Sequence, residues 1–470
     1  MKPIITIALL LVINLISCTN PSSNRIYTST NTELQTALNQ ANPGDTIIVK
    51  NGDYHNMLLE MNRSGNKDKR ITIKAETAGK SFFTGETGIR IKGDYITFSG
   101  FSFEGAMIHS EFVDLKEKYK EINFRKYEHP PLIESEGSYN TFEDLYINKV
   151  SNNPKLDHHT YFLLHDSTQY NIINRCWLER KTQRGMGVLI HATKDFHEGR
   201  YHVVTNCYFK ADRQDGNGGS AVRIGTGMET TEGIAKCTVK NCFFDEYDGE
   251  EEIFSIKSTG TTLDSNTFLN CRGMLSFRHS HNNVLSNCFI INNDESPIEG
   301  GFFCIWGKGH KIVNNYFYGS KRNKRTTGTI SMISGNSDKI TTTHEAVADI
   351  LIKDNIIYES DTSGYAITVG ARHKYRSENR SILPRDVTIA GNYIYNSSEK
   401  EQIKYTESPK NIKYSDNKVF GNIGLSPVPE GIVKTDIKLV ADKYGIYRAK
   451  GKGPAGNPLS KKDVGPKWLQ

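Results

Sequence analysis

The side chains most suited to chemistry lie in residues 248–258. Glu250 and Glu252 are two positions apart, and Lys257 follows shortly after them. Alternate side chains of an extended strand point to the same face, so the two carboxylates should project together. Adjacent carboxylates repel unless a proton or a cation lies between them, and a hard cation such as calcium prefers oxygen ligands. The stretch therefore predicts a cation site beside a lysine.

A second basic residue, Arg278, follows Lys257 after twenty-one residues. That interval is about one turn of a solenoid built from parallel strands. We therefore expect Arg278 to lie about one rung beyond Lys257.

The elements that would position these residues form an irregular repeat. From Ile71 onward short β-branched runs recur, and the later runs lead to an asparagine followed by an apolar or aromatic pair. Asparagine tolerates left-handed backbone geometry and can bond its neighbour in the next coil. The pattern predicts an all-β fold, a right-handed parallel β-helix; an antiparallel sandwich would need more Asn-Gly or Asp-Gly hairpin turns. The repeating asparagines are Asn174, Asn206, Asn241, Asn266, Asn287, Asn315, Asn355, Asn392 and Asn417.

A short helix should precede the strands. Thr30 and Glu33 have capping-box spacing, and one apolar face is expected from Leu34, Ala37, Leu38 and Ala41. A helix placed there would cover the open end of a solenoid, whose edge would otherwise be unpaired.

The first residues predict export. The apolar run from Ile4 to Ile16 is too short to span a bilayer and is typical of a secretory signal. Residues 15–18 resemble a bacterial lipobox, which implies cleavage before Cys18 and diacylation of that cysteine; an ordinary signal peptide is the alternative. We expect a signal peptide over 1–17 and a single domain over 18–470. The protein would be an exported lipoprotein, periplasmic or on the cell surface, held to the membrane only through Cys18.

Seven cysteines follow Cys18. Disulfides are the first expectation in an exported protein. Several of these cysteines recur at one point of the repeat, however, which favours a stack of small, buried, free side chains. The recurring cysteines are Cys176, Cys207, Cys242 and Cys288.

Charge and loops favour an acidic partner. The formal net charge is +6, and a polyanionic glycan suits an exported protein better than nucleic acid does. Long insertions occur at 112–131, 212–231, 320–348 and 371–384. Loops on one side of a solenoid commonly build its binding site, although a charged loop can also be plain solvated surface.

With these residues in place, the chain resembles polysaccharide lyase family six, which contains chondroitinase B and many alginate lyases. The resemblance is carried by residues 248–253, Lys257-Ser258, residues 277–279 and the Gly-Gly-Phe-Phe-Cys-Ile-Trp-Gly run at 300–307. It extends from the expected capping helix to residues 465–469, as in one-domain members. It implies a right-handed parallel β-helix that cleaves uronate polymers by β-elimination.

The resemblance also implies roles for particular residues. Lys257 matches the Brønsted base and Arg278 the acid, while Glu250, Glu252 and Asn217 match calcium ligands, although some relatives work without calcium. The register near Asn217 departs from the family at Ser220 and Ala221. Candidate substrate contacts, each with ordinary packing or surface as its alternative, are Lys181, Arg184, Arg223, His279, Trp306, His310 and Arg372.

The chemistry explains why these residue types are needed. The proton to be removed lies on C5 of a uronate, whose carboxylate is a poor electron sink until a cation neutralises it. The base must be neutral, and calcium and Arg278 would lower the pKa of Lys257 while the glutamates would raise it. Because a guanidinium holds its proton tightly, Arg278 could instead stabilise the leaving oxygen while water supplies the proton.

The sequence thus predicts an alginate lyase, with a monomer expected. A dermatan sulfate lyase is the alternative within the class, and it would need extra cations for sulfate. A hydrolase could use Glu250 and Glu252 as its acid pair, but it would leave Lys257 and Arg278 without a role. A non-catalytic, lipid-anchored glycan-binding protein is the third possibility. Block preference and endo or exo action stay open.

Overall fold

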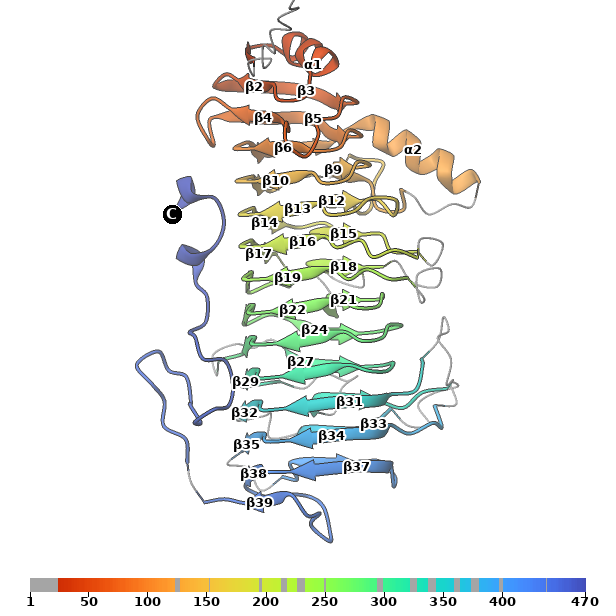
Figure 1. Cartoon of the computed structure of the whole chain (residues 1–470), viewed down its shortest axis with the longest axis vertical. Helices are drawn as coiled ribbons and strands as arrows, with labels where there is room; N and C mark the ends of the chain where they lie inside the picture. Colours follow the sequence, from red (N-terminus) through yellow and green to blue (C-terminus); the bar gives the residue numbers. More distant parts are fainter. Residues whose placement is uncertain are drawn as a thin grey trace, which may run out of the picture.

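The computed structural model describes residues 24–122, 127–151, 153–193, 197–212, 218–225, 233–248, 251–293, 299–321, 328–336, 344–358, 364–372, 380–396, 400–436 and 438–470. Its strands stack as successive coils along one long axis, with parallel pairing between coils, so the fold is the predicted parallel β-helix (Figure 1). Within the described residues, no helix is long and apolar enough to cross a membrane. The predicted signal segment and Cys18 lie outside the described residues.

Among the described residues, one sheet has 14 strands, and we name it the first ladder. Its strands are β1 (Arg25–Thr28), β2 (Thr46–Val49), β4 (Ile71–Ala75), β6 (Ile96–Ser99), β10 (Thr141–Glu143), β13 (Ile172–Asn174), β16 (Val203–Thr205), β19 (Thr238–Lys240), β22 (Thr262–Asp264), β25 (Val284–Ser286), β28 (Lys311–Val313), β31 (Ala348–Lys353), β34 (Arg385–Ala390) and β37 (Lys410–Ser415).

The other sheet has 25 strands in the described part of the chain and contains two ladders that join at β5. The second ladder comprises β7 (Ser102–Glu104), β11 (Tyr146–Asn148), β14 (Trp177–Lys181), β17 (Tyr208–Ala211), β20 (Phe243–Asp245), β23 (Thr267–Leu269), β26 (Phe289–Ile291), β29 (Tyr316–Tyr318), β32 (Ile356–Tyr358), β35 (Tyr393–Tyr395), β38 (Asn417–Phe420) and β39 (Ile432–Lys434). The third ladder comprises β3 (Gly52–Met61), β5 (Ser81–Ile91), β8 (Met107–Ile108), β9 (Pro131–Ser135), β12 (Thr160–Leu164), β15 (Val188–Ile190), β18 (Val222–Ile224), β21 (Glu252–Ile256), β24 (Gly273–Phe277), β27 (Gly300–Ile305), β30 (Gly328–Ile333), β33 (Tyr365–Ala371) and β36 (Ile403–Tyr405).

The core fills the inside of the coils. Alternation along each strand sends one set of side chains inward, and equivalent positions of successive coils stack. Phe244, for example, stacks between Phe209 and Phe268, with ring centroids 4.8 and 4.4 Å away. Such pairs contribute about 0.5–1.5 kcal/mol beyond the burial of their area. The core therefore fixes the register in which coils stack.

The repeated asparagines lie at the bend before the second ladder and serve it in two ways. Asn206, Asn241 and Asn287 themselves have positive φ, which confirms the predicted left-handed geometry. At Asn266, Asn315, Asn355, Asn392 and Asn417 the preceding residue has positive φ and the asparagine is buried, whereas at Asn174 the following residue, Arg175, has positive φ. Amide ladders then link coils; Nδ2 of Asn355 donates to Oδ1 of Asn392 at 2.9 Å.

The recurring cysteines occupy the same inward position. All seven cysteines of the described residues are buried and free. The prediction of stacked free thiols, rather than disulfides, is confirmed for them.

The N-terminal end of the solenoid matches expectation. The helix α1 (Asn31–Gln40) begins at Thr30, whose hydroxyl accepts from the Glu33 N–H at 3.2 Å, and it buries Leu34, Ala37 and Leu38. It covers the first coil (Figure 1). The C-terminal segment, with short 3-10 turns at η2 (Lys461–Asp463) and η3 (Lys467–Leu469), runs back along the outside, where the Leu459 N–H donates to Oγ1 of Thr267 at 2.8 Å.

One helix was not expected. The insertion at 112–131 contains α2 (Ser110–Glu121), which projects from the side of the solenoid near β9 (Figure 1). Only Phe112 and Val113 are buried among its residues. Its polar composition hid it from a search for apolar periodicity.

Candidate active site

Lys257 and Arg278 occupy the same position after neighbouring strands. Ile256 of β21 pairs with Phe277 of β24. The pairing continues one residue further, because the Arg278 N–H donates to the Ile256 carbonyl at 2.8 Å. Both side chains therefore leave on the same face. The prediction that Arg278 lies one rung beyond Lys257 is confirmed.

Trp306 extends this row by a further rung. Its N–H donates to the Phe277 carbonyl at 2.9 Å. The Arg278 guanidinium carbon lies 5.8 Å from the Trp306 ring centroid, which is within cation–π reach. We name the row of residues at this position after each strand of the third ladder the Lys257 row.

Glu252 lies at the start of β21, where a β-bulge shifts the register. A bulge re-aims the side chain beside it, and this one directs the Glu252 carboxylate toward the Lys257 row. Oε1 accepts from the Arg278 guanidinium at 2.9 Å, and Oε2 accepts from the Ser255 hydroxyl at 2.7 Å. Ser255 was not foreseen; it is the outward residue between two buried neighbours, Phe254 and Ile256.

Glu252 is ionised despite its burial. Burial alone would raise its pKa, but the positive charges of Arg278 and Lys257, the Ser255 hydrogen bond and the charge of Arg223 together lower it to about 2. Arg223 reaches this position from β18, whose Arg223 pairs with Ser255. One carboxylate is thus surrounded by three cationic side chains, an arrangement that suits an anionic ligand.

Imidazoles border Arg278 on its other side. His279 has φ +53° and is 5% exposed. Burial, followed by the charges of Arg278, His344 and Lys257, lowers its pKa to about 3. His344 lies 5.6 Å from the Trp306 ring and 6.1 Å from His279 between centroids. Both imidazoles are therefore neutral at physiological pH and can exchange hydrogen bonds with a sugar hydroxyl.

His344 was missed by the sequence reasoning. It lies in the insertion at 320–348, and its Nε2 is 3.4 Å from Arg380. A histidine in a basic loop gives no periodic signal that would place it over Trp306. Arg372, which was foreseen, follows β33 with φ +59° and lowers the pKa of His344 after burial, Arg380 and Arg278.

Two predicted contacts lie inside the protein instead. His310 is fully buried, with Nδ1 accepting from the Asn283 N–H at 3.1 Å and Nε2 2.9 Å from the Trp306 carbonyl. Lys181 is 1% exposed, and its ammonium donates to the Gln183 carbonyl at 2.7 Å. Both side chains make their hydrogen bonds within the solenoid, which corrects their assignment as substrate contacts.

The position of His310 had a sequence signal. His310 precedes β28 as His202 precedes β16, and Nδ1 of His202 accepts from the Asn171 N–H in the same way. Both histidines therefore stand at the bend before the first ladder, where other coils have Asn140, Asn171 and Asn283. Arg184, by contrast, is exposed. It forms a parallel bridge with His158 and precedes β15, which lies two rungs before β21, the strand that carries Glu252.

The predicted calcium site is described only in part. Asn217 and Glu250 lie outside the described residues. No group of three or more His, Cys, Asp or Glu side chains in the described ranges could hold a metal. Glu252 fits one role, since it is a buried, ionised oxygen ligand. A cation bound there would compete with Arg278 for Oε1.

Comparison with known proteins places the chain in a family. The family model for chondroitinase B matches residues 28–452. No functionally curated protein matches the chain.

Solved structures share the fold. The family-six alginate lyase AlyGC aligns with a TM-score of 0.80 at 23% identity over 95% of this chain and 59% of its own. The chain thus spans about three fifths of that relative. A family-six polysaccharide lyase from Pseudopedobacter saltans, Pedsa3628, aligns with a TM-score of 0.71 at 24% identity over 94% and 99%. A mannuronic acid-specific family-six lyase from human gut microbiota gives 0.68 at 20% over 88% and 91%.

The family model covers most of the solenoid, including β21, β24 and the row that carries Lys257 and Arg278. The chain belongs to the chondroitinase B family, that is, to polysaccharide lyase family six.

Proposed function

We propose that the protein is an alginate lyase that cleaves by β-elimination. The observation that carries this proposal is the pairing of Lys257 and Arg278 one rung apart, around the buried and ionised Glu252. A hydrolase would need two carboxylates flanking the scissile bond. Glu252 is instead bonded to Arg278 and Ser255, which suits a charged scaffold rather than a proton-shuttling acid.

The residues divide the work as follows. Arg223 and Arg278 face the uronate carboxylate and disperse the charge that develops when the C5 proton leaves. Lys257, in its neutral form, accepts that proton, so it must lose its own proton before each turnover. Arg278 also lies where it can stabilise the oxygen of the leaving sugar, whose proton then comes from water.

Calcium is part of the proposal. Held by Glu252 together with Asn217 and Glu250, it would supply Lewis-acid neutralisation of the substrate carboxylate. The lipid anchor at Cys18, export and a monomeric state are likewise proposed from the sequence alone.

Alginate is favoured over dermatan sulfate. Two of the similar structures are described as alginate or mannuronate lyases. The description of the matching family model supports the second candidate, dermatan sulfate. The partly exposed Arg372 would be a candidate to meet the sulfate groups of that substrate.

Ultraviolet absorbance tests both candidates. β-Elimination creates a conjugated, unsaturated uronate that absorbs, whereas hydrolysis and binding do not. Purified protein should raise the absorbance with alginate. A rise only with dermatan sulfate would change the assigned substrate to dermatan sulfate and leave the proposed mechanism unchanged. A flat trace in both, with calcium present and folding verified, would refute both assignments.

A further inference from the structure

The Lys257 row continues toward the N-terminal end of the solenoid. Backbone N–H groups donate to the preceding rung at each step, as at His191 to Leu164 (3.0 Å) and His165 to Ser135 (3.0 Å). The row therefore runs Glu136, His165, His191, Gly225, Lys257, Arg278 and Trp306. A polymer lying along the axis from Lys257 would meet these rungs in reverse order.

At β5 and β9 this face is covered rather than open. Phe112 of α2 packs on the outward side of Gly88, where an added Cβ would lie 2.6 Å from its ring. The Arg90 guanidinium carbon lies 4.7 Å from the Phe112 ring centroid. Arg90 also pairs with Glu111 of α2 at 3.7 Å. The first turn of α2 is thus seated on the face itself.

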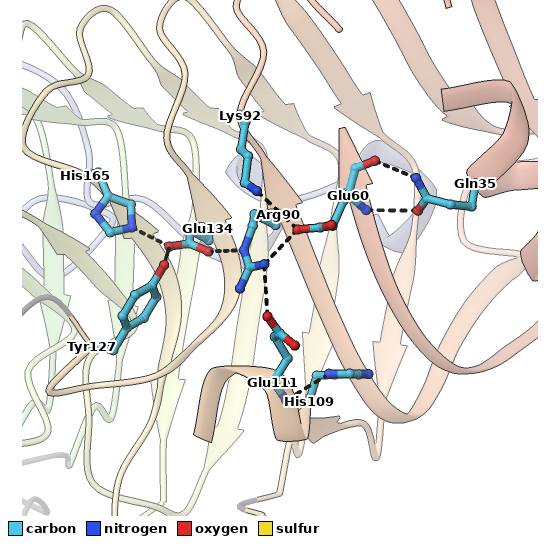
Figure 2. Close-up of polar contacts among 9 residues, drawn as sticks. All are labelled: Gln35, Glu60, Arg90, Lys92, His109, Glu111, Tyr127, Glu134 and His165. Atoms are coloured by element: carbon cyan, nitrogen blue, oxygen red, sulfur yellow. Dashed lines mark hydrogen bonds and ion pairs between the residues drawn. The ribbon is translucent and has the colours of Figure 1, made fainter. Parts of the chain in front are cut away.

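A buried ionic network fixes this cover (Figure 2). Arg90 donates to Glu134 at 2.8 Å and to Glu60 at 2.7 Å, and the Tyr127 hydroxyl donates to Glu134 at 2.6 Å. His165 lies 2.5 Å from the same Glu134 oxygen. Glu134 is fully buried and Tyr127 is 3% exposed. No part of Glu134 is therefore open to a sugar.

A second contact ties α2 to the next coil. Lys116 lies 3.3 Å from Asp157, and the same Asp157 oxygen bonds Nδ1 of His158. His158 precedes β12 and forms a parallel bridge with Arg184 in the next coil. The first turn of α2 is therefore held at β5, and Lys116 links the middle of the helix to the segment before β12.

Between α2 and the rung of Lys257, the layer at β12 and β15 is an apolar cluster of Leu163, Met186 and Leu189, each at most 2% exposed. His165 and His191 border it, with ring centroids 5.7 Å apart.

We propose that α2 and Tyr127, which we name the N-terminal wall, end the substrate-binding face on this side and limit it to short products. Four rung spacings separate β9 from β21, roughly 19 Å at about 4.8 Å each. A sugar residue is about as long as one rung spacing, so roughly three residues fit between Lys257 and the wall. This inference rests on the proposed lyase function, and it names which end of the site is closed.

Product sizes test the wall. Alginate is digested to a few per cent conversion, and viscosity, absorbance and the masses of released fragments are followed together. The wall predicts fragments of up to about three residues from the outset, with slow loss of viscosity. Early loss of viscosity with a broad ladder of long fragments would overturn it.

Variants assign the effect to α2. Replacing residues 110–122 with a short Gly-Ser linker should convert the product pattern to long fragments. If that variant fails to fold, Lys116→Ala loosens the same contact and should raise the share of fragments longer than three residues about two- to fivefold, the range expected for one partly exposed ion pair. Lys118→Ala, an exposed lysine on the same helix, is the matched control and should leave the pattern unchanged. Wild-type products from a folded linker variant would overturn the role of α2.

A failure of the wall can be distinguished from a failure of the lyase assignment. If no uronate polymer is cleaved, the proposed function fails, and binding of oligomannuronates of increasing length decides the wall. Affinity should then rise over the first residues and level off at a short length. Affinity that keeps rising with length, or an absence of binding, would overturn the wall as well.

Discussion

The carboxylate of Glu134 offers the sharpest test of the electrostatics in this fold. We predict that Glu134→Gln lowers the free energy of unfolding by about 3 kcal/mol at pH 7. The side chain is fully buried, which would raise its pKa, yet His165, Tyr127 and Arg90 lower the pKa from 4.5 to about 2. A shift of this size corresponds to about 3 kcal/mol of stabilisation of the ionised form in the folded protein.

The sign of the pH dependence follows from the direction of the shift. A carboxyl group whose pKa is depressed by folding stabilises the protein above its unfolded pKa and loses this contribution as the pH falls toward the folded value. The difference between wild type and Glu134→Gln should therefore be full at pH 6–7 and shrink between about pH 4.5 and pH 2.

Urea unfolding at pH 7 and pH 3 measures the difference. Glu60→Gln is the matched control, because Glu60 bonds the same Arg90 but its side chain is 32% exposed. It should cost less and vary less with pH, since solvent screens exposed pairs. Equal losses for Glu134→Gln at both pH values, or no loss at pH 7, would refute the reasoning.

Three further outcomes are expected. Lys257→Ala should lower the rate of absorbance increase at least about 100-fold with little change in oligosaccharide affinity, measured by calorimetry; loss of both would indicate misfolding or a binding role. Chelation with EDTA should lower the lyase rate, and added calcium should restore it; a rate insensitive to EDTA would remove calcium from the mechanism. The seven buried cysteines should stay unreactive toward a thiol reagent until unfolding, since burial raises the pKa of thiols such as Cys288 to about 12; rapid reaction of the native protein would contradict their burial.

The sequence was most informative where the regular stacking of coils relates the spacing of residues in the chain to their positions in space. The interval of twenty-one residues between Lys257 and Arg278 equals one coil, because β21, β22, β23 and β24 follow one another through short turns. The recurring cysteines, together with the asparagines from Asn266 onward that are buried, likewise identified one inward position of the coils from Cys176 to Asn417. Stacking of equivalent positions converts such intervals into spatial neighbours.

Residues beside loops could not be placed in this way. His310 directly precedes β28, and Lys181 is the last residue of β14. Sequence alone does not say whether a side chain at such a position points into the bend or away from it. The helix α2 was missed because its apolar face is short and its N-cap is His109 rather than serine, threonine, aspartate or asparagine. The packing of its Phe112 on Gly88 depends on contacts between residues that are far apart in the chain.

The division between strands and loops explains how such a site can change substrate without losing its chemistry. Strand pairing alone sets the relative position of Lys257 and Arg278, because their backbone N–H groups extend the ladder hydrogen bonds of β21 and β24. Loops set everything else: α2 closes one end, and His344 reaches Trp306 from another insertion. A change in either loop can lengthen, shorten or recharge the binding face while the proton-transfer pair keeps its one-rung spacing. If the protein is the proposed alginate lyase, its substrate length and block preference should therefore vary with the insertions, and its β-elimination chemistry should depend on the third ladder.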